Sequence, residues 1–210
     1  MIRRILGSKK QKKQKIWFIH IPKNAGTSIV KALNIRPVSH ITAKEILESS
    51  DKQRYLNSYS FCVVRHPYNR FISLYNYAKM EKSYYHDNIE PKNSIYGEHL
   101  DYKTLKNASI EECAELLLKG KLKHDLVWNH WRPQSSWVYD ETFKNLLVDR
   151  VFHLEKIEEL YDSNIINLKK KVPQLNTSST SINIGDLDNN TKEILVNYYK
   201  KDFELFNYKT

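Results

Sequence analysis

The chain has 210 residues, of which 40% are hydrophobic and 28% are charged. These values are typical of a single globular domain with its own core. With only 5 glycines and 6 prolines, collagen-like and Pro/Gly-rich disordered classes are excluded. Two cysteines, Cys62 and Cys113, are too few for a disulfide framework or a four-cysteine zinc site. We therefore expect a reducing compartment, or a protein indifferent to redox conditions.

The formal net charge of +10 is concentrated at the N-terminus. Residues 1–15 carry seven basic side chains and no acidic one, which leaves 27 basic against 24 acidic residues in 16–210. The net charge of residues 16–210 is thus close to zero. Such a charge does not indicate a nucleic-acid partner, and we expect none. We expect residues 1–15 to be a disordered basic tail. It is either simply solvated or in peripheral contact with a membrane surface.

Membrane insertion and secretion are not expected from the hydropathy pattern. No run of 18 apolar residues exists, which excludes a membrane-spanning helix. The basic N-terminus lacks an apolar stretch that ends in small residues, so we also expect no secretory signal.

Strands and helices are predicted to alternate from residue 16 onward. The apolar runs Ile16–Ile21 and Tyr59–Val64 indicate buried strands. Between them, a helix is expected over Thr27–Asn34, and a second begins at Thr42, where Thr42 and Glu45 have the spacing of a capping box, and ends near Ser49.

The second half of the chain continues the same pattern. The remaining predicted elements are a helix opened by Pro67, a surface excursion over 81–107, a capped helix from Ser109 to about Lys119, a strand over Val151–Leu154, a helix over Glu155–Lys171, a loop over 173–190 and a helix over Thr191–Phe206. This alternation predicts a single α/β domain over 16–210. Its central parallel sheet is P-loop-like and has helices on both faces.

The first candidate site lies between the first strand and the first helix. The segment His20–Ser28 places Lys23 and Gly26 in a tight loop, and Thr27 and Ser28 at the helix start. Backbone N–H groups and the helix dipole make such a loop suited to a phosphate. It is not a Walker A motif, because the lysine precedes the glycine instead of following it. An ordinary strand-turn-helix with an exposed lysine is the alternative interpretation.

The second candidate site follows the second strand. Arg65 lies at the strand end and Ser73 two turns into the next helix. Ligands of open α/β sheets bind at the carboxyl ends of the strands, and an arginine there can hold a phosphate with two hydrogen bonds. The alternative is a charged strand end followed by a solvent-facing serine.

Together, the two motifs resemble the sulfotransferase superfamily, and the first resembles its carbohydrate branch in bacterial members. The resemblance covers about residues 16–208 and includes four further stretches: His40–Ile46, His130–Gln134, Val151–Glu155 and Tyr199–Tyr208. It implies the co-substrate 3′-phosphoadenosine 5′-phosphosulfate, with adenosine 3′,5′-bisphosphate as the product. It also implies that the first loop, namely Lys23, Asn24, Ala25, Gly26, Thr27 and Ser28, holds the 5′-phosphosulfate, and that Arg65 and Ser73 hold the 3′-phosphate.

The expected chemistry needs a base and no metal. The chain has no Asp-rich cluster typical of a metal site, and lysine and backbone donors can stabilise the leaving phosphate. Histidine suits the base at neutral pH. The resemblance places His40 where glycan enzymes keep their catalytic histidine, with His130 as the second candidate. Lys23 would neutralise the leaving group.

We therefore expect a sulfotransferase that acts on a hydroxyl of a carbohydrate or glycolipid. Because the chain shows no membrane anchor and few cysteines, a bacterial cytoplasmic enzyme is favoured. Two alternatives remain open: a nucleotide-binding module without catalysis, and a P-loop kinase. Arg70 is expected either to support the 3′-phosphate or to pair with an acid, and Gln134 to touch the acceptor or the nucleotide.

Overall fold

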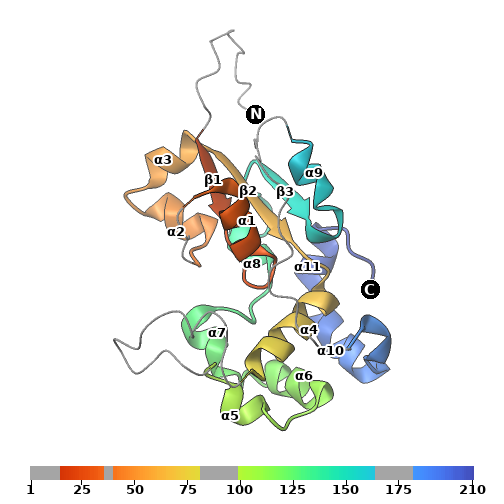
Figure 1. The fold of residues 1–210 in the computed structure, drawn as a ribbon. Coiled ribbons are helices and arrows are strands. Elements are labelled where there is room, and N and C mark those ends of the chain that lie inside the picture. The colour runs from red at the N-terminus through yellow and green to blue at the C-terminus, as the bar shows by residue number, and fades with distance from the viewer. Residues whose placement is uncertain (1–14, 36–39, 81–98, 164–181) are drawn as a thin grey trace.

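The computed structural model describes residues 15–35, 40–80, 99–163 and 182–210. Within these ranges it has a three-stranded parallel sheet in the order β1 (Ile16–Ile19), β2 (Tyr59–Val64) and β3 (Arg150–His153) (Figure 1). The expected basic tail lies almost entirely outside the described residues. The predicted α/β class with a parallel sheet is confirmed.

The central strand β2 separates two hydrophobic layers. Phe61 and Val63 belong to one buried cluster, and Cys62 and Val64 to another, as the period of two in a strand requires. All four side chains are at most 1% exposed. Both faces of the sheet are therefore covered, which explains why β2 reads as a continuous apolar run.

Helices pack on each of these faces, as the sequence predicts. The helices α1 (Gly26–Leu33) and α9 (Glu158–Tyr161) cover the face of Phe61 through Ile29 and Leu160. The opposite face is covered by α2 (Ala43–Glu48), α3 (Lys52–Leu56) and α8 (Ser135–Val138). Figure 1 shows α1 and α9 on one side of the sheet.

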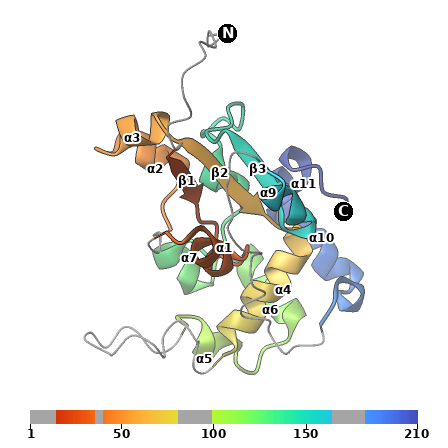
Figure 2. The same cartoon turned by 45° about the horizontal axis from the view of Figure 1, so that its top comes forward.

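A second group of helices lies beyond the carboxyl ends of the strands (Figures 1 and 2). One large core is shared by α4 (Pro67–Ala78), α5 (Tyr102–Leu105), α6 (Ile110–Leu118), α10 (Asn189–Tyr198) and α11 (Lys200–Leu205). The short helix α7 (Lys123–Trp128) lies in the same group. The strand ends therefore face this helical layer, so residues that follow β1 and β2 are enclosed between the sheet and the helices.

Local sequence signals placed several helix starts correctly. In α2 and in α6, the Thr42 and Ser109 side chains accept from the backbone N–H three residues on, and the glutamate there accepts from the cap residue. Pro67 opens α4, where a missing N–H costs no hydrogen bond.

Three expected elements were wrong in their described parts. Residues 155–163 hold a 3₁₀ turn and the short α9 instead of one helix, because the Glu155 carboxylate bonds the His66 N–H and the Tyr208 hydroxyl. The last helix is broken at the fully buried Tyr199, whose hydroxyl donates to the Trp131 carbonyl. Residues 99–107 are not a surface excursion, since α5 and the buried Asp101 lie there.

No helix among the described residues is long and apolar enough to cross a bilayer. This agrees with the expectation from hydropathy.

One buried hydrogen-bond network joins the strand ends to the C-terminal helices. The Gln134 amide oxygen accepts from Asn24 Nδ2 at 2.7 Å and from the Arg65 N–H at 2.9 Å, while its nitrogen donates to the Arg65 carbonyl at 2.8 Å. Asp202 accepts the backbone N–H groups of Gln134 and Ser135, each at 2.7 Å. Gln134, Ser135 and Asp202 have no exposed surface. Gln134 thus holds the backbone. The sequence analysis had instead expected it to touch the acceptor or the nucleotide.

Replacing Gln134 should cost much of the stability. In Gln134→Ala, the Asn24 amide and the Arg65 backbone lose their buried partners, at about 1–3 kcal/mol for each unsatisfied group. We expect the free energy of unfolding, measured by urea denaturation, to fall by about 3 kcal/mol. The exposed Gln53 on α3 provides the matched control, since Gln53→Ala removes no buried partner. Equal stability of the two variants would contradict the role given to Gln134.

Candidate active site

The two sequence motifs meet at one edge of the sheet. The loop 20–25 follows β1 and Arg65 follows β2, and these strands pair in parallel with Ile19 opposite Cys62. Their carboxyl ends are therefore adjacent, as ligand sites in open α/β sheets require. Asn24 joins the two segments directly, because its Nδ2 donates to the Val63 carbonyl at 2.9 Å as well as to Gln134.

The loop backbone takes an uncommon conformation for a segment with one glycine. Lys23 and Ala25 have φ values of +67° and +59°, in the left-handed region that non-glycine residues rarely adopt. The buried Asn24 lies between them. A left-handed residue followed by a helical one turns successive N–H groups toward the same side, which is an anion-binding arrangement.

The helix α1 begins directly at the end of this loop. Its cap residue Ala25 supplies no side-chain hydrogen bond, and its first turn has no acidic residue. The N–H groups of the first turn are thus not satisfied by a side-chain cap and carry the positive end of the helix dipole. The Thr27 side chain is exposed, whereas Ser28 is buried.

Gly26 is required by contact with His20. A Cβ on Gly26 would lie 1.8 Å from Nε2 of His20, so only glycine lets the imidazole pack against the start of the helix.

Lys23 places a cation beside this loop. Its Nζ lies 4.2 Å from the centre of the Tyr77 ring on α4, a cation–π contact. Burial and the nearby Arg65 lower the pKa of Lys23 to about 8. An anion bound beside this ammonium would stabilise its charged form and raise the pKa of Lys23 toward its ordinary value. Lys23 therefore favours an anionic ligand here.

Arg65 and Ser73 flank the same strand end. The Arg65 guanidinium is half-buried and makes no hydrogen bond or ion pair within the described part of the chain. Desolvation lowers its pKa, an effect that Glu155 and Tyr208 partly oppose. Ser73 is half-buried on α4, and about 9 Å of helical rise separates it from Pro67.

His40 has a defined orientation beside the loop. Its Nδ1 lies 3.1 Å from the His20 carbonyl oxygen, and its ring centre lies 4.5 Å from that of His20. A carbonyl only accepts, so Nδ1 carries the proton and Nε2 of the neutral ring has the lone pair. Burial lowers the pKa of His40, with its bond to the His20 carbonyl opposing and Arg70 adding to the effect.

His130 lies on the other side of His40, with 5.3 Å between the ring centres. The fully buried Arg70 fixes its backbone, because the guanidinium donates to the carbonyls of His130, Arg132 and Pro22. Arg70 thus ties the Lys23 loop to the His130 segment. It forms no ion pair among the described residues, so the expected pairing with an acid was wrong.

These groups suit a ligand with two anionic ends. One anion would be held by the loop N–H groups and Lys23, and the other by Arg65. A neutral imidazole with its lone pair on Nε2 lies beside the first of these positions. Among the residues that the structure describes, no carboxylate forms an ion pair with Arg65 or Arg70.

The sequence was compared with known proteins. A model of the Sulfotransferase family matches residues 9–209. The chain belongs to the sulfotransferase family. Membership implies an enzyme that transfers a sulfuryl group from 3′-phosphoadenosine 5′-phosphosulfate. No curated protein and no solved structure matched the chain.

Sequence reasoning missed Tyr77, which lies under Lys23 in this candidate site. It singled out Arg70 and Gln134 in other roles, Arg70 as a support for the 3′-phosphate or a partner of an acid, and Gln134 as a contact of the acceptor or the nucleotide. In the structure, Arg70 joins the loop to the His130 segment, and Gln134 joins the loop to Arg65. Nothing in the local pattern distinguishes a polar side chain that bonds a distant backbone from one that faces a ligand.

Gly26→Ala tests the packing of the loop. The added methyl group must displace the His20 ring, and overpacking of this kind costs about 1–3 kcal/mol. We expect a lower melting temperature and weaker binding of adenosine 3′,5′-bisphosphate, followed by calorimetry. Gly185→Ala is the control, because a Cβ there meets nothing within 4 Å. If Gly26→Ala bound the nucleotide as wild type does, the His20 contact would not matter for the site.

Proposed function

We propose that this sulfotransferase acts on a hydroxyl group of a carbohydrate or glycolipid, with His40 as the general base. The observation that carries the mechanism is the bond from His40 Nδ1 to the His20 carbonyl. It leaves the lone pair on Nε2, the arrangement needed to accept a proton. His20 also packs against Gly26, so the base is coupled to the loop proposed to hold the donor.

Each end of the donor has a separate set of residues. The N–H groups of residues 24–28 and the Lys23 ammonium receive the 5′-phosphosulfate, supported by the uncapped start of α1. Arg65 and Ser73 receive the 3′-phosphate. The absence of any hydrogen bond to the Arg65 guanidinium within the described ranges supports this assignment.

The transfer is an in-line displacement at sulfur. The acceptor oxygen forms a bond to sulfur, and the bond from sulfur to the 5′-phosphate oxygen breaks. The acceptor proton passes to Nε2 of His40, and Lys23 stabilises the charge that develops on the leaving phosphate. The products are a sulfate ester and adenosine 3′,5′-bisphosphate, and no other reactant is needed.

The carbohydrate acceptor rests on the resemblance of His20–Ser28 to the carbohydrate branch, and so does the bacterial cytoplasmic setting. The kinase alternative is disfavoured because Lys23 precedes the glycine of the loop.

The donor site is tested by nucleotide binding. Adenosine 3′,5′-bisphosphate at 100 times its dissociation constant should stabilise the protein by about 2.7 kcal/mol, or about 5–10 °C in melting temperature. AMP and ATP without metal should shift it less. Arg65→Ala should abolish the preference for the bisphosphate, whereas Arg54→Ala on the exposed helix α3 should not. Equal shifts with ATP would favour the kinase or the binding module.

The pH profile tests His40 and Lys23 together. The reaction needs a neutral His40, whose pKa lies below 6.5, and a charged Lys23, whose pKa is about 8. We expect kcat/KM to fall at a pH lower than an ordinary histidine would give, because the pKa of His40 is lowered, and to fall again as pH increases above about 8. His40→Ala should bind the bisphosphate but not turn over. Lys23→Arg should lack the alkaline decline, because a guanidinium stays charged, and a decline that persisted would assign it to another group.

A further inference from the structure

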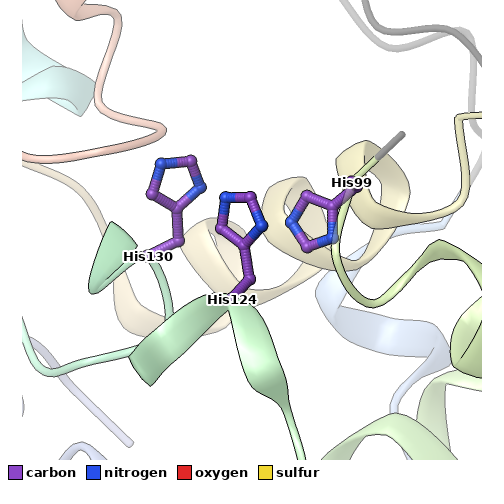
Figure 3. Close-up of side chains that lie close together, drawn as sticks. All are labelled: His99, His124 and His130. Atoms are coloured by element: carbon purple, nitrogen blue, oxygen red, sulfur yellow. The ribbon is translucent and has the colours of Figure 1, made fainter. Parts of the chain in front are cut away.

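Three buried histidines lie one after another, starting beside His40. His130, His124 and His99 are 8%, 4% and 2% exposed, and each offers a ring nitrogen within 4.8 Å of those of the other two. The ring centres of His130 and His124 are 4.3 Å apart, and those of His124 and His99 are 3.7 Å apart. Figure 3 shows the three rings side by side, with His124 in the middle.

We call His130, His124 and His99 the histidine row. The buried carboxylate of Asp101 fixes the backbone beside it. Asp101 has no exposed surface and accepts from the backbone N–H groups of Lys123 and His124 and from Nε1 of Trp131. Its 3.9 Å approach to Nδ1 of His99 is too long for a hydrogen bond. Asp101 therefore fixes the start of α7, which carries His124, and the side chain of Trp131, which follows His130.

Backbone donors determine where two of these rings carry their proton. The Leu100 N–H donates to Nδ1 of His124 at 3.4 Å, and the Asp101 N–H donates to Nδ1 of His99 at 3.1 Å. A nitrogen that accepts a hydrogen bond has no proton. The neutral His124 and His99 rings therefore carry it on Nε2 and offer an N–H donor there.

The same geometry disfavours a metal ion at the three histidines. The His99 and His124 rings are nearly parallel, at 10°, so their in-plane lone pairs do not converge on one point. Binding through Nδ1 would displace two backbone N–H groups, and binding through Nε2 would move the ring proton to Nδ1, where it would face the same backbone N–H groups. The charge of Lys23, which already lowers the pKa of His130, adds repulsion.

His130 is placed to receive a hydrogen bond from this row. Its Nδ1 is buried and has no hydrogen-bond partner within the described part of the chain. Figure 3 shows one nitrogen of His130 turned toward His124 and the other turned away. A water molecule that accepts from Nε2–H of His124 and donates to Nδ1 of His130 would leave the His130 proton on Nε2. His130 and His40 then have opposite tautomers.

We propose that His130 is a hydrogen-bond donor to the transferring sulfuryl group, and that His124, backed by His99, is the positioning residue that keeps the His130 proton on Nε2. This inference rests on the proposed function. It resolves the choice of base, since a ring with its proton on Nε2 presents no lone pair to the acceptor hydroxyl. Desolvation, the other histidines and Lys23 hold the pKa of His130 well below 6.5, so the ring stays neutral.

Glutamine substitutions separate a donor from a base. The Gln side-chain amide keeps an N–H near the position of Nε2 but cannot take up a proton at neutral pH. We expect His130→Gln to keep kcat within about tenfold of wild type, and His130→Ala to lose about 10²–10³-fold, as for other lost donors to a transition state. Bisphosphate binding should be unchanged in both. His153→Gln, a histidine outside the row, should match wild type.

Two results would overturn the inference. If His130→Gln and His130→Ala were equally inactive beside an active wild type, His130 would not act as a donor. If His124→Leu kept the wild-type kcat, the row would not position His130. We expect His124→Leu to lower kcat at unchanged bisphosphate affinity and His124→Gln to restore much of it. Inactivity of wild type with every hydroxyl acceptor would instead contradict the proposed function.

A separate metal-binding experiment tests whether the three histidines hold a metal ion. Dialysed wild-type protein is incubated with one equivalent of Zn²⁺ or Co²⁺ and passed over a desalting column. We expect no retained metal. One retained equivalent in wild type and none in His124→Gln would assign the histidines to a metal ion and overturn the donor role.

Discussion

The site depends on the buried amide of Gln134. Four of its hydrogen-bonding positions are used, to Asn24, to both backbone groups of Arg65 and, weakly, to Asp202. An unsatisfied polar group in this interior would be costly, so the segments it joins cannot separate without loss of several bonds. The donor loop, the Arg65 strand end and the C-terminal helix α11 therefore form one rigid unit.

This rigid unit also determines the electrostatics of the candidate site. Lys23, Arg65 and Arg70 bring three cations close together, and the histidines nearby are kept neutral by burial and by those charges. A doubly anionic ligand relieves the repulsion between the cations. The proposed donor binding and the proposed neutral base would thus both follow from the same excess of positive charge.

Strands and helix starts that depend on neighbouring residues could be predicted from the sequence. The apolar run Tyr59–Val64 and the capping boxes at Thr42 and Ser109 contain their own cause within a few positions, and the structure has these elements at those places. Both strand-end motifs were read from their residues, and the family that they resemble is the one whose model matches the chain. The carbohydrate branch and the roles of individual residues stay predictions.

Features set by distant partners were missed. The helices α3, α7 and α8 have four to six residues each, too few to be stable without packing. Gln134 bonds Asn24 across 110 positions and Arg65 across 69, and no local pattern reveals such pairs. The histidine row likewise joins α7 to residue 99, which the sequence placed in a surface excursion.

The donor loop differs physically from glycine-rich phosphate loops. Its left-handed residues are Lys23 and Ala25, and each costs about 1–2 kcal/mol relative to a right-handed conformation. Asn24, bonded to the Val63 carbonyl and to Gln134, holds the loop in this shape before any ligand binds. The strain is thus the means by which the N–H groups converge. A loop already ordered loses less entropy on binding than a flexible one, so the buried side chains of Asn24 and Gln134 would favour binding of the proposed donor by holding the loop in shape.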